Sequence, residues 1–150
     1  MKDGIKYMSI KIKPIIYVLL GLPGSGKTTL AHHIANRSGT TIQSYDSIPG
    51  ANSMGYSFKK VKEDWISNIR NDLLQGQNVV IDGLLLYRKD RVEMLSALDD
   101  IDCIKFLLYK QIPVETCLER NRGREARLPD FIIQQSARKL EPPSKDEGWD

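Results

Sequence analysis

The apolar residues of this chain form two patterns, short continuous runs and stripes at helical spacing. Continuous or β-branched runs occupy residues 15–20, 40–45, 78–82 and 102–109. A parallel strand that is buried on both faces gives such a continuous run, so these segments predict four strands of a parallel sheet.

Between the runs, apolar residues recur every three or four positions, which predicts amphipathic helices. The longest stripe spans residues 57–75 and includes Trp65, which we assign to the core rather than to a base-stacking surface. Further helices are predicted after the first strand, over residues 88–99, from Pro113, and from Pro129 to Leu140. Strands that alternate with helices favour a parallel sheet with right-handed crossovers.

Residues 21–28, Gly-Leu-Pro-Gly-Ser-Gly-Lys-Thr, lie between the first strand and the first helix. They fit the phosphate-binding motif G-x-x-x-x-G-K-[ST] at every fixed position. Its glycines let backbone N–H groups converge on phosphate oxygens, its lysine neutralises the β- and γ-phosphates, and its threonine holds Mg²⁺. The alternative is an ordinary glycine-rich turn. The sequence therefore predicts ATP or GTP binding by Gly21, Gly24, Ser25, Gly26, Lys27, Thr28 and Thr29.

Two carboxylates come at the ends of predicted strands. Asp46 closes the second strand, and Asp82 closes the third. In phosphate-loop enzymes a strand-end Asp meets Mg²⁺ directly or through water, so Asp82 is a candidate metal residue beside Thr28. The other reading of Asp82 is a plain turn cap. The turn formers at 47–55 indicate an acceptor-binding loop, because open α/β sheets bind ligands at carboxyl ends of strands.

The segment 119–127 carries four arginines around Gly123. Guanidinium groups match phosphate oxygens in pairs, and a segment that contains glycine can fold over a site. We therefore predict an arginine-rich lid on the donor phosphates, with Arg122 or Arg124 as the contact; a solvated surface is the alternative.

Length and composition fit one domain of 150 residues, with an N-terminal arm at 1–13 and the folded domain at 14–150. The net charge of +3 is too small to indicate nucleic-acid binding by itself. Cys103 and Cys117 stand in apolar patterns and are expected to be buried, reduced thiols. We expect a cytoplasmic protein, since neither a membrane span nor a secretion signal is evident.

The phosphate loop, the strand-end Asp46 and Asp82, and the segments 88–91, 119–129, 141–143 and 147–149 together resemble the polynucleotide-kinase-like branch of phosphate-loop kinases. The resemblance covers nearly the whole chain. It implies a three-layer α/β fold, strand order 2-3-1-4, and ATP with Mg²⁺ as donor. It also implies that Asp46 is the base for the acceptor hydroxyl and that Asp82 orders the acceptor side.

Two positions depart from the family pattern. Pro49 stands where an arginine contacts the 3′-phosphate side of the acceptor, and Gly83 stands where a hydroxyl residue follows the strand-end Asp. The resulting hypothesis is an ATP-dependent kinase for the 5′-hydroxyl of a nucleic acid. A nucleoside or other small-molecule kinase is the alternative, and a nucleotide-driven ATPase switch is the alternative from another class.

Overall fold

The computed structural model describes residues 12–51, 57–83 and 85–150. Most of the predicted N-terminal arm, and residues 52–56 of the predicted acceptor loop, lie outside these ranges.

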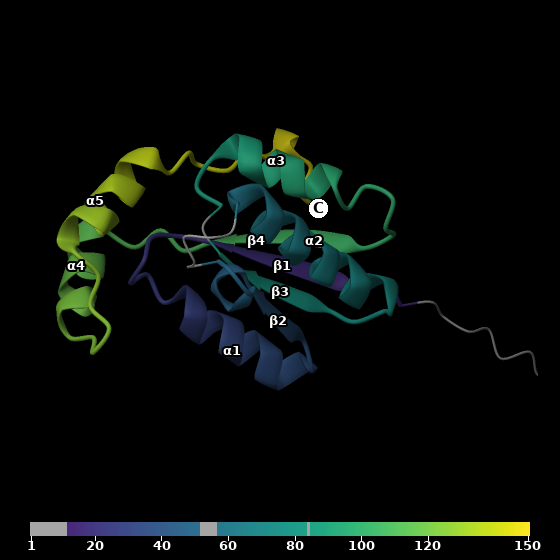
Figure 1. Cartoon of the computed structure of the whole chain (residues 1–150), viewed down its shortest axis with the longest axis horizontal. Coiled ribbons are helices and arrows are strands. Elements are labelled where there is room, and N and C mark those ends of the chain that lie inside the picture. The colour runs from purple at the N-terminus through teal and green to yellow at the C-terminus, as the bar shows by residue number, and fades with distance from the viewer. Residues whose placement is uncertain (1–11, 52–56, 84) are drawn as a thin grey trace, which may run out of the picture.

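Four parallel strands form one sheet at the centre of the molecule (Figure 1). They are β1 (Ile15–Leu20), β2 (Thr41–Ser44), β3 (Val79–Asp82) and β4 (Ile104–Tyr109). Their order is β2-β3-β1-β4, which confirms the predicted 2-3-1-4 arrangement. Val18 of β1 pairs with Ile81 of β3 and with Leu107 of β4, so the central strand is covered by neighbours on both sides. The carboxyl ends of all four strands therefore meet at one edge of the sheet.

Helices cover both faces of the sheet and complete the predicted three layers (Figure 1). α1 (Lys27–Ser38) packs on one face, and α2 (Phe58–Leu74) and α3 (Arg88–Ser96) pack on the other. α3 ends at Ser96, three residues before the predicted end at residue 99. The apolar spacing continues past the helix because Leu98, in the turns that follow, is still fully buried.

The main core lies between the sheet and α2 with α3. It contains Ile16, Val18, Val79 and Ile81 from the strands and Val61, Trp65, Ile69 and Leu73 from α2. Trp65 is 3% exposed, as its place in the apolar stripe predicted. Burial of each such side chain contributes about 1.5–3 kcal/mol, which fixes α2 against the sheet.

The chain beyond β4 forms two short helices and a returning segment at one end of the sheet (Figure 1). α4 (Val114–Arg122) and α5 (Asp130–Lys139) pack around Leu22, Cys117 and Ile133. Residues 140–150 then cross to α3 and include the 3-10 turn η2 (Lys145–Glu147), and Trp149 packs against the main core. Cys103 and Cys117 are buried and free, as expected. None of the helices in the described ranges has the length and apolar character to cross a membrane.

Candidate active site

The phosphate loop connects β1 to α1 at the carboxyl edge of the sheet. Gly24 and Gly26 have φ angles of 84° and 93°, a left-handed conformation that favours glycine. A Cβ at Gly24 would stand 2.8 Å from the Cys117 carbonyl oxygen, so α4 leaves no room for a side chain there. Gly24 is therefore required by both backbone conformation and packing, and Gly26 by backbone conformation.

Lys27 is the first residue of α1, and its side chain folds back over the loop. The ammonium donates to the carbonyl oxygens of Gly21, at 2.7 Å, and Leu22, at 3.1 Å. Burial lowers the pKa of Lys27, and the negative charge of Asp82 opposes that shift. A lysine desolvated in this way is an unscreened positive charge beside the loop, which suits a polyphosphate.

Thr28 and Asp82 lie together although 54 positions separate them in sequence: the Thr28 hydroxyl donates to Asp82 Oδ2 at 3.1 Å. A hydroxyl and a carboxylate are oxygen ligands of the kind that Mg²⁺ takes, the rest of its shell being phosphate and water. The described ranges contain no cluster of three His, Cys, Asp or Glu side chains that could hold a metal alone. These residues thus fit a magnesium ion that arrives with its nucleotide, rather than a closed protein metal site.

A cavity of about 770 Å³ opens beside the phosphate loop. Its walls come from the loop, the 3-10 turn η1 (Tyr45–Ser47), α2, the β3–α3 connection, α3 and the arginine segment. Lys27, Thr28, Asp46 and Asp82 all line it. The structure therefore brings the predicted donor residues, except Gly21 and Ser25, to one space with Asp82 at the end of β3 and Asp46 in η1, two residues beyond β2.

The arginine segment contributes two of its four arginines to this cavity, Arg120 and Arg124. Arg120 Nη1 also approaches the Gly24 carbonyl oxygen at 3.4 Å. Arg122 is not among the lining residues; it lies 3.7 Å from the Asp130 carboxylate and its side chain is 58% exposed. Of the two arginines predicted from sequence, Arg124 is thus the one that the structure places at the cavity, and Arg120 joins it.

Buried Asn121 holds the arginine segment in this conformation. Its side-chain amide donates to the Leu128 carbonyl at 2.7 Å and accepts from the Leu128 N–H at 3.0 Å. This paired contact closes residues 121–128 into a loop, because both backbone polar groups of Leu128 are tied to one side chain. Asn121 therefore supports the side of the cavity on which Arg124 lies.

Lys110 is a cation near the phosphate loop that the sequence analysis did not identify. It follows β4 directly, and its ammonium lies 2.9 Å from the point where a Cβ of Gly26 would stand. Arg120 Nη1 lies 3.9 Å from that same point. Two cations beside one glycine of the loop suit a nearby phosphate. Lys110 comes directly after a strand of the same sheet, and this position is a signal that could have identified it.

The other side of the cavity is aromatic. Tyr45 packs edge-on against Trp65, with ring centroids 5.4 Å apart at 88°, and lies 5.9 Å from the Phe58 ring. Burial raises the pKa of Tyr45, and the neighbouring Asp46 charge raises it further. A Cβ at Gly83 would stand 2.9 Å from the Trp65 ring, so Trp65 takes the space that a side chain at position 83 needs. Trp65 is thus a core residue that also lines the cavity.

Comparison with known proteins agrees with this architecture. Residues 16–143 match a family described as an AAA domain. The chain is 23% identical over 145 residues to the L-seryl-tRNA(Sec) kinase of Methanococcus maripaludis, covering 91% of this chain and 56% of that protein. The chain thus spans little more than half the length of this curated relative.

Two solved structures show the same fold. A gluconokinase from Sinorhizobium meliloti superposes with a TM-score of 0.66 at 22% identity, covering 87% of this chain and 77% of its own. A chain of the Pnkp1/Rnl/Hen1 RNA repair complex gives 0.71 at 16% identity, covering 93% of this chain and 47% of its own. The family match covers most of the chain, which therefore belongs to this AAA domain family and carries a phosphate-binding motif on a parallel sheet of order β2-β3-β1-β4.

Proposed function

We propose that this domain transfers the γ-phosphoryl group of ATP to the 5′-hydroxyl of a nucleic acid. The observation that carries the proposal is that Asp46, Asp82, Lys27 and Arg124 line a single cavity. That set supplies a base, a metal residue and two phosphate cations, which are the parts that phosphoryl transfer needs.

In this mechanism Lys27, Arg120 and Arg124 hold the donor phosphates and spread the charge that develops on the transferring group. Thr28 and Asp82 would hold Mg²⁺, which would supply positive charge to neutralise the donor phosphates. Asp46 accepts the proton of the acceptor hydroxyl. The hydroxyl oxygen then bonds to the γ-phosphorus as the bond from that phosphorus to the β–γ bridging oxygen breaks, and ADP leaves.

The acceptor side of the cavity supports a nucleotide unit as substrate. Tyr45 and Phe58 present aromatic rings there, and Phe58 is 71% exposed. Aromatic rings stack on bases with little regard to sequence, at about 1–3 kcal/mol per base. Lys62 also lines the cavity, but Glu93 lies 2.6 Å and Asp90 4.0 Å from its ammonium. This neutralised lysine, with Pro49 in place of the family arginine, supports an acceptor that is held by its base and hydroxyl more than by a phosphate.

A nucleoside or another small alcohol is the second candidate acceptor. The same aromatic wall would hold a single base, and both the gluconokinase and the seryl-tRNA kinase among the similar proteins are named as kinases. An ATPase switch, with water as acceptor, is the alternative of another class.

Transfer of ³²P from γ-labelled ATP tests these proposals. The acceptors are a 5′-hydroxyl DNA oligonucleotide, the same sequence in RNA, a nucleoside panel and water alone. Label on oligonucleotides supports the proposal, and a matched oligonucleotide that already bears a 5′-phosphate is the control. Label that appears only on nucleosides would show that the acceptor is a small molecule and not a polynucleotide. Phosphate release without any labelled acceptor would replace the kinase by an ATPase.

A further inference from the structure

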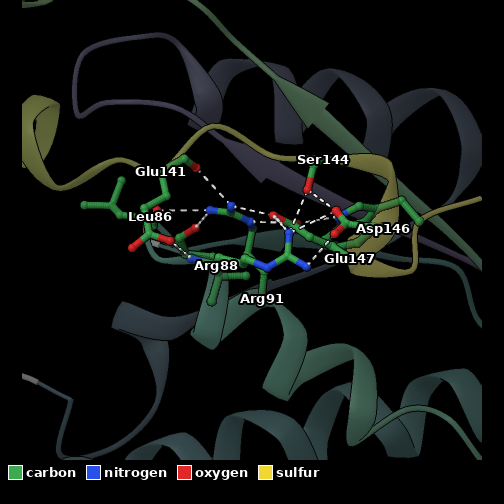
Figure 2. Close-up of polar contacts among 9 residues, drawn as sticks. Leu86, Arg88, Arg91, Glu141, Ser144, Asp146 and Glu147 are labelled. Carbon is green, nitrogen blue, oxygen red and sulfur yellow. Dashed lines mark hydrogen bonds and ion pairs between the residues drawn. The ribbon is translucent and has the colours of Figure 1, made fainter.

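Arg91 of α3 is the largest fully buried side chain of the described core, and all of its hydrogen-bonding capacity is used. Figure 2 shows its guanidinium between the β3–α3 connection and the C-terminal segment. Nη1 donates to the carbonyl oxygens of Leu85, at 2.9 Å, and Leu86, at 3.0 Å. Nη2 donates to the Glu141 carbonyl at 2.9 Å. Nε and Nη2 donate to the two carboxylate oxygens of Glu147, at 3.0 Å and 2.7 Å.

Glu147 is the counter-charge that makes this burial possible. Its side chain, like that of Arg91, is 0% exposed, and its Oε2 also accepts from Trp149 Nε1 at 2.8 Å. An unpaired guanidinium in such a place would be strongly unfavourable, so the position of Arg91 depends on a carboxylate contributed by the end of the chain. The C-terminal segment 141–150 is therefore part of the structure around α3, not an appendage.

The same segment also caps α3. Tyr87, at the start of the helix, makes no side-chain cap, and the N–H of the first helical residue, Arg88, donates instead to Glu141 Oε2 at 3.0 Å. A carboxylate at a helix N-terminus is stabilising because it satisfies an otherwise unpaired N–H and complements the helix dipole. Arg88 in turn reaches Ser144 and Asp146 (Figure 2). The contacts of Arg88 and those of Arg91 thus both fix α3 to residues 141–147.

What Arg91 holds is the acceptor side of the cavity. Leu85 lines the cavity and accepts from Arg91, and Asp90, the residue before Arg91, lines it as well. We propose that the pair of Arg91 and Glu147 is a positioning device for acceptor binding, through which the C-terminal segment fixes the wall formed by Leu85 and Asp90. This inference rests on the proposed function, because it takes that wall to be the acceptor side.

The donor side gives the proposal its discriminating test. Lys27, Thr28 and the phosphate loop belong to β1 and α1, on which none of these contacts with Arg91 falls. If the pair positions the acceptor wall, its loss is expected to weaken acceptor binding and to leave ATP binding unchanged. In Glu147→Gln, which keeps the shape but not the charge, KM for the acceptor oligonucleotide is expected to rise at least ~10-fold. The affinity for a non-hydrolysable ATP analogue is expected to stay within ~2-fold, as measured by calorimetry.

Asp102→Asn is the matched control, since it removes an exposed carboxylate that pairs with Lys13 and does not line the cavity. It is expected to leave both constants unchanged. Glu147→Asp, with its carboxylate retained, is expected to recover part of the loss. If Glu147→Gln does not fold, Glu141→Ala, which removes only the cap on α3, takes its place and predicts a smaller rise in acceptor KM.

Equal loss of acceptor and ATP binding in a folded variant would overturn the proposal, as would an unchanged acceptor KM. If the wild-type domain labels no acceptor, the proposed function fails but the positioning claim is still tested. Hydrogen exchange at the Leu85 and Leu86 amides and through α3 is then compared in Glu147→Gln and Asp102→Asn. Faster exchange there in the former alone, with the phosphate loop unaffected, supports the device. Identical patterns in the two variants reject it.

Discussion

The hydroxyl of Thr28 and the carboxylate of Asp82 are joined by a hydrogen bond of 3.1 Å, although one lies in the first turn of α1 and the other ends β3. The contact follows from the sheet, because β1 and β3 are hydrogen-bonded neighbours and their carboxyl ends meet. It places a hydroxyl and a carboxylate oxygen side by side, near the charge of Lys27.

Asp82→Asn is expected to increase the Mg²⁺ concentration needed for half-maximal turnover by roughly 10- to 100-fold, the usual effect of losing a supporting metal contact. The amide oxygen can still accept from Thr28, so the fold is retained. Titration of activity with MgCl₂ measures the change. Asp102→Asn, at an exposed carboxylate paired with Lys13, serves as the control. An unchanged Mg²⁺ requirement would show that Asp82 caps a turn and does not contact the metal.

Arg120→Ala and Arg124→Ala are each expected to lower kcat at least ~10²-fold, a modest part of the effect of an arginine that stabilises transferring phosphate. Arg122→Ala is expected to change it little, because Arg122 faces Asp130 outside the cavity. Single-turnover kinetics at saturating ATP make the comparison. The assignment fails if Arg122→Ala is as damaging as Arg124→Ala.

Gly83→Ser is expected to destabilise the domain by about 1–3 kcal/mol, the common cost of overpacking a core, because its Cβ would collide with Trp65. Trp65→Leu removes the ring that it strikes. Urea unfolding of the two single variants and the double variant measures their coupling, expected at about 0.5–3 kcal/mol for residues in contact. Additive effects would show that Trp65 does not occupy the space at position 83.

The exposed pairs of Arg70 with Asp100 and of Arg88 with Asp146 predict a defined loss of stability in acid. A hydrogen bond from Arg70 lowers the pKa of Asp100 to about 2, and one from Arg88 does the same for Asp146, from an ordinary value of 3.8. A carboxyl group whose pKa is lower in the native state than in the unfolded state stabilises the fold at any pH above its unfolded-state pKa. That stabilisation is lost as the pH falls to the native-state pKa. Wild type is therefore expected to lose its advantage over Asp100→Asn and Asp146→Asn between about pH 4 and pH 2. Urea midpoints across this range test it, and a difference independent of pH would contradict it.

Much of the fold could be predicted because local pattern and global topology agree in this chain. The apolar runs at 15–20 and 78–82 form strands. The motif between the first strand and the first helix forms the loop that connects them. That placed Lys27, Thr28 and Asp82 correctly at one edge of the sheet. The sequence could not reveal which arginines line the cavity, because that depends on tertiary contacts. Asn121 closes the loop, and Arg122 pairs with Asp130 away from the cavity.

Contacts between distant segments were likewise beyond the sequence patterns. Arg91 looks like a surface residue in a helix rich in charges, and only the fold shows that Glu147 meets it 56 positions later. Lys110 was overlooked because it belongs to no motif, and its place directly after β4 was the one signal that could have identified it. In both cases the physical significance comes from burial or from neighbours, and neither can be read from spacing.

Asp46 separates the functional classes. It is exposed at the cavity wall in η1, next to Tyr45, and as a base it would contribute typically 10² to 10⁴ to the rate. Asp46→Asn, nearly equal in shape but unable to take the proton, is therefore expected to depress oligonucleotide phosphorylation by about that factor, or ~3 to 5 kcal/mol of barrier. Affinity for ATP is expected to remain, since Asp46 lies in η1 and not in the phosphate loop that would hold the donor.

The measurement is ³²P transfer to a 5′-hydroxyl oligonucleotide, with hydrolysis in water followed in parallel. Asp64→Asn, at an exposed carboxylate of α2 paired with Lys60, is the control. A loss of transfer with hydrolysis unchanged identifies Asp46 as the base for a hydroxyl acceptor. Hydrolysis that is insensitive to the substitution, with no labelled acceptor from either the wild type or the variant, would instead make Asp46 structural and the domain an ATPase. Because Pro49 replaces the family arginine, transfer is also expected to depend only weakly on a 3′-phosphate on the acceptor nucleotide. A strong dependence would show that another cation of the acceptor side contacts this phosphate. Lys62→Met would be the first substitution to test for that contact.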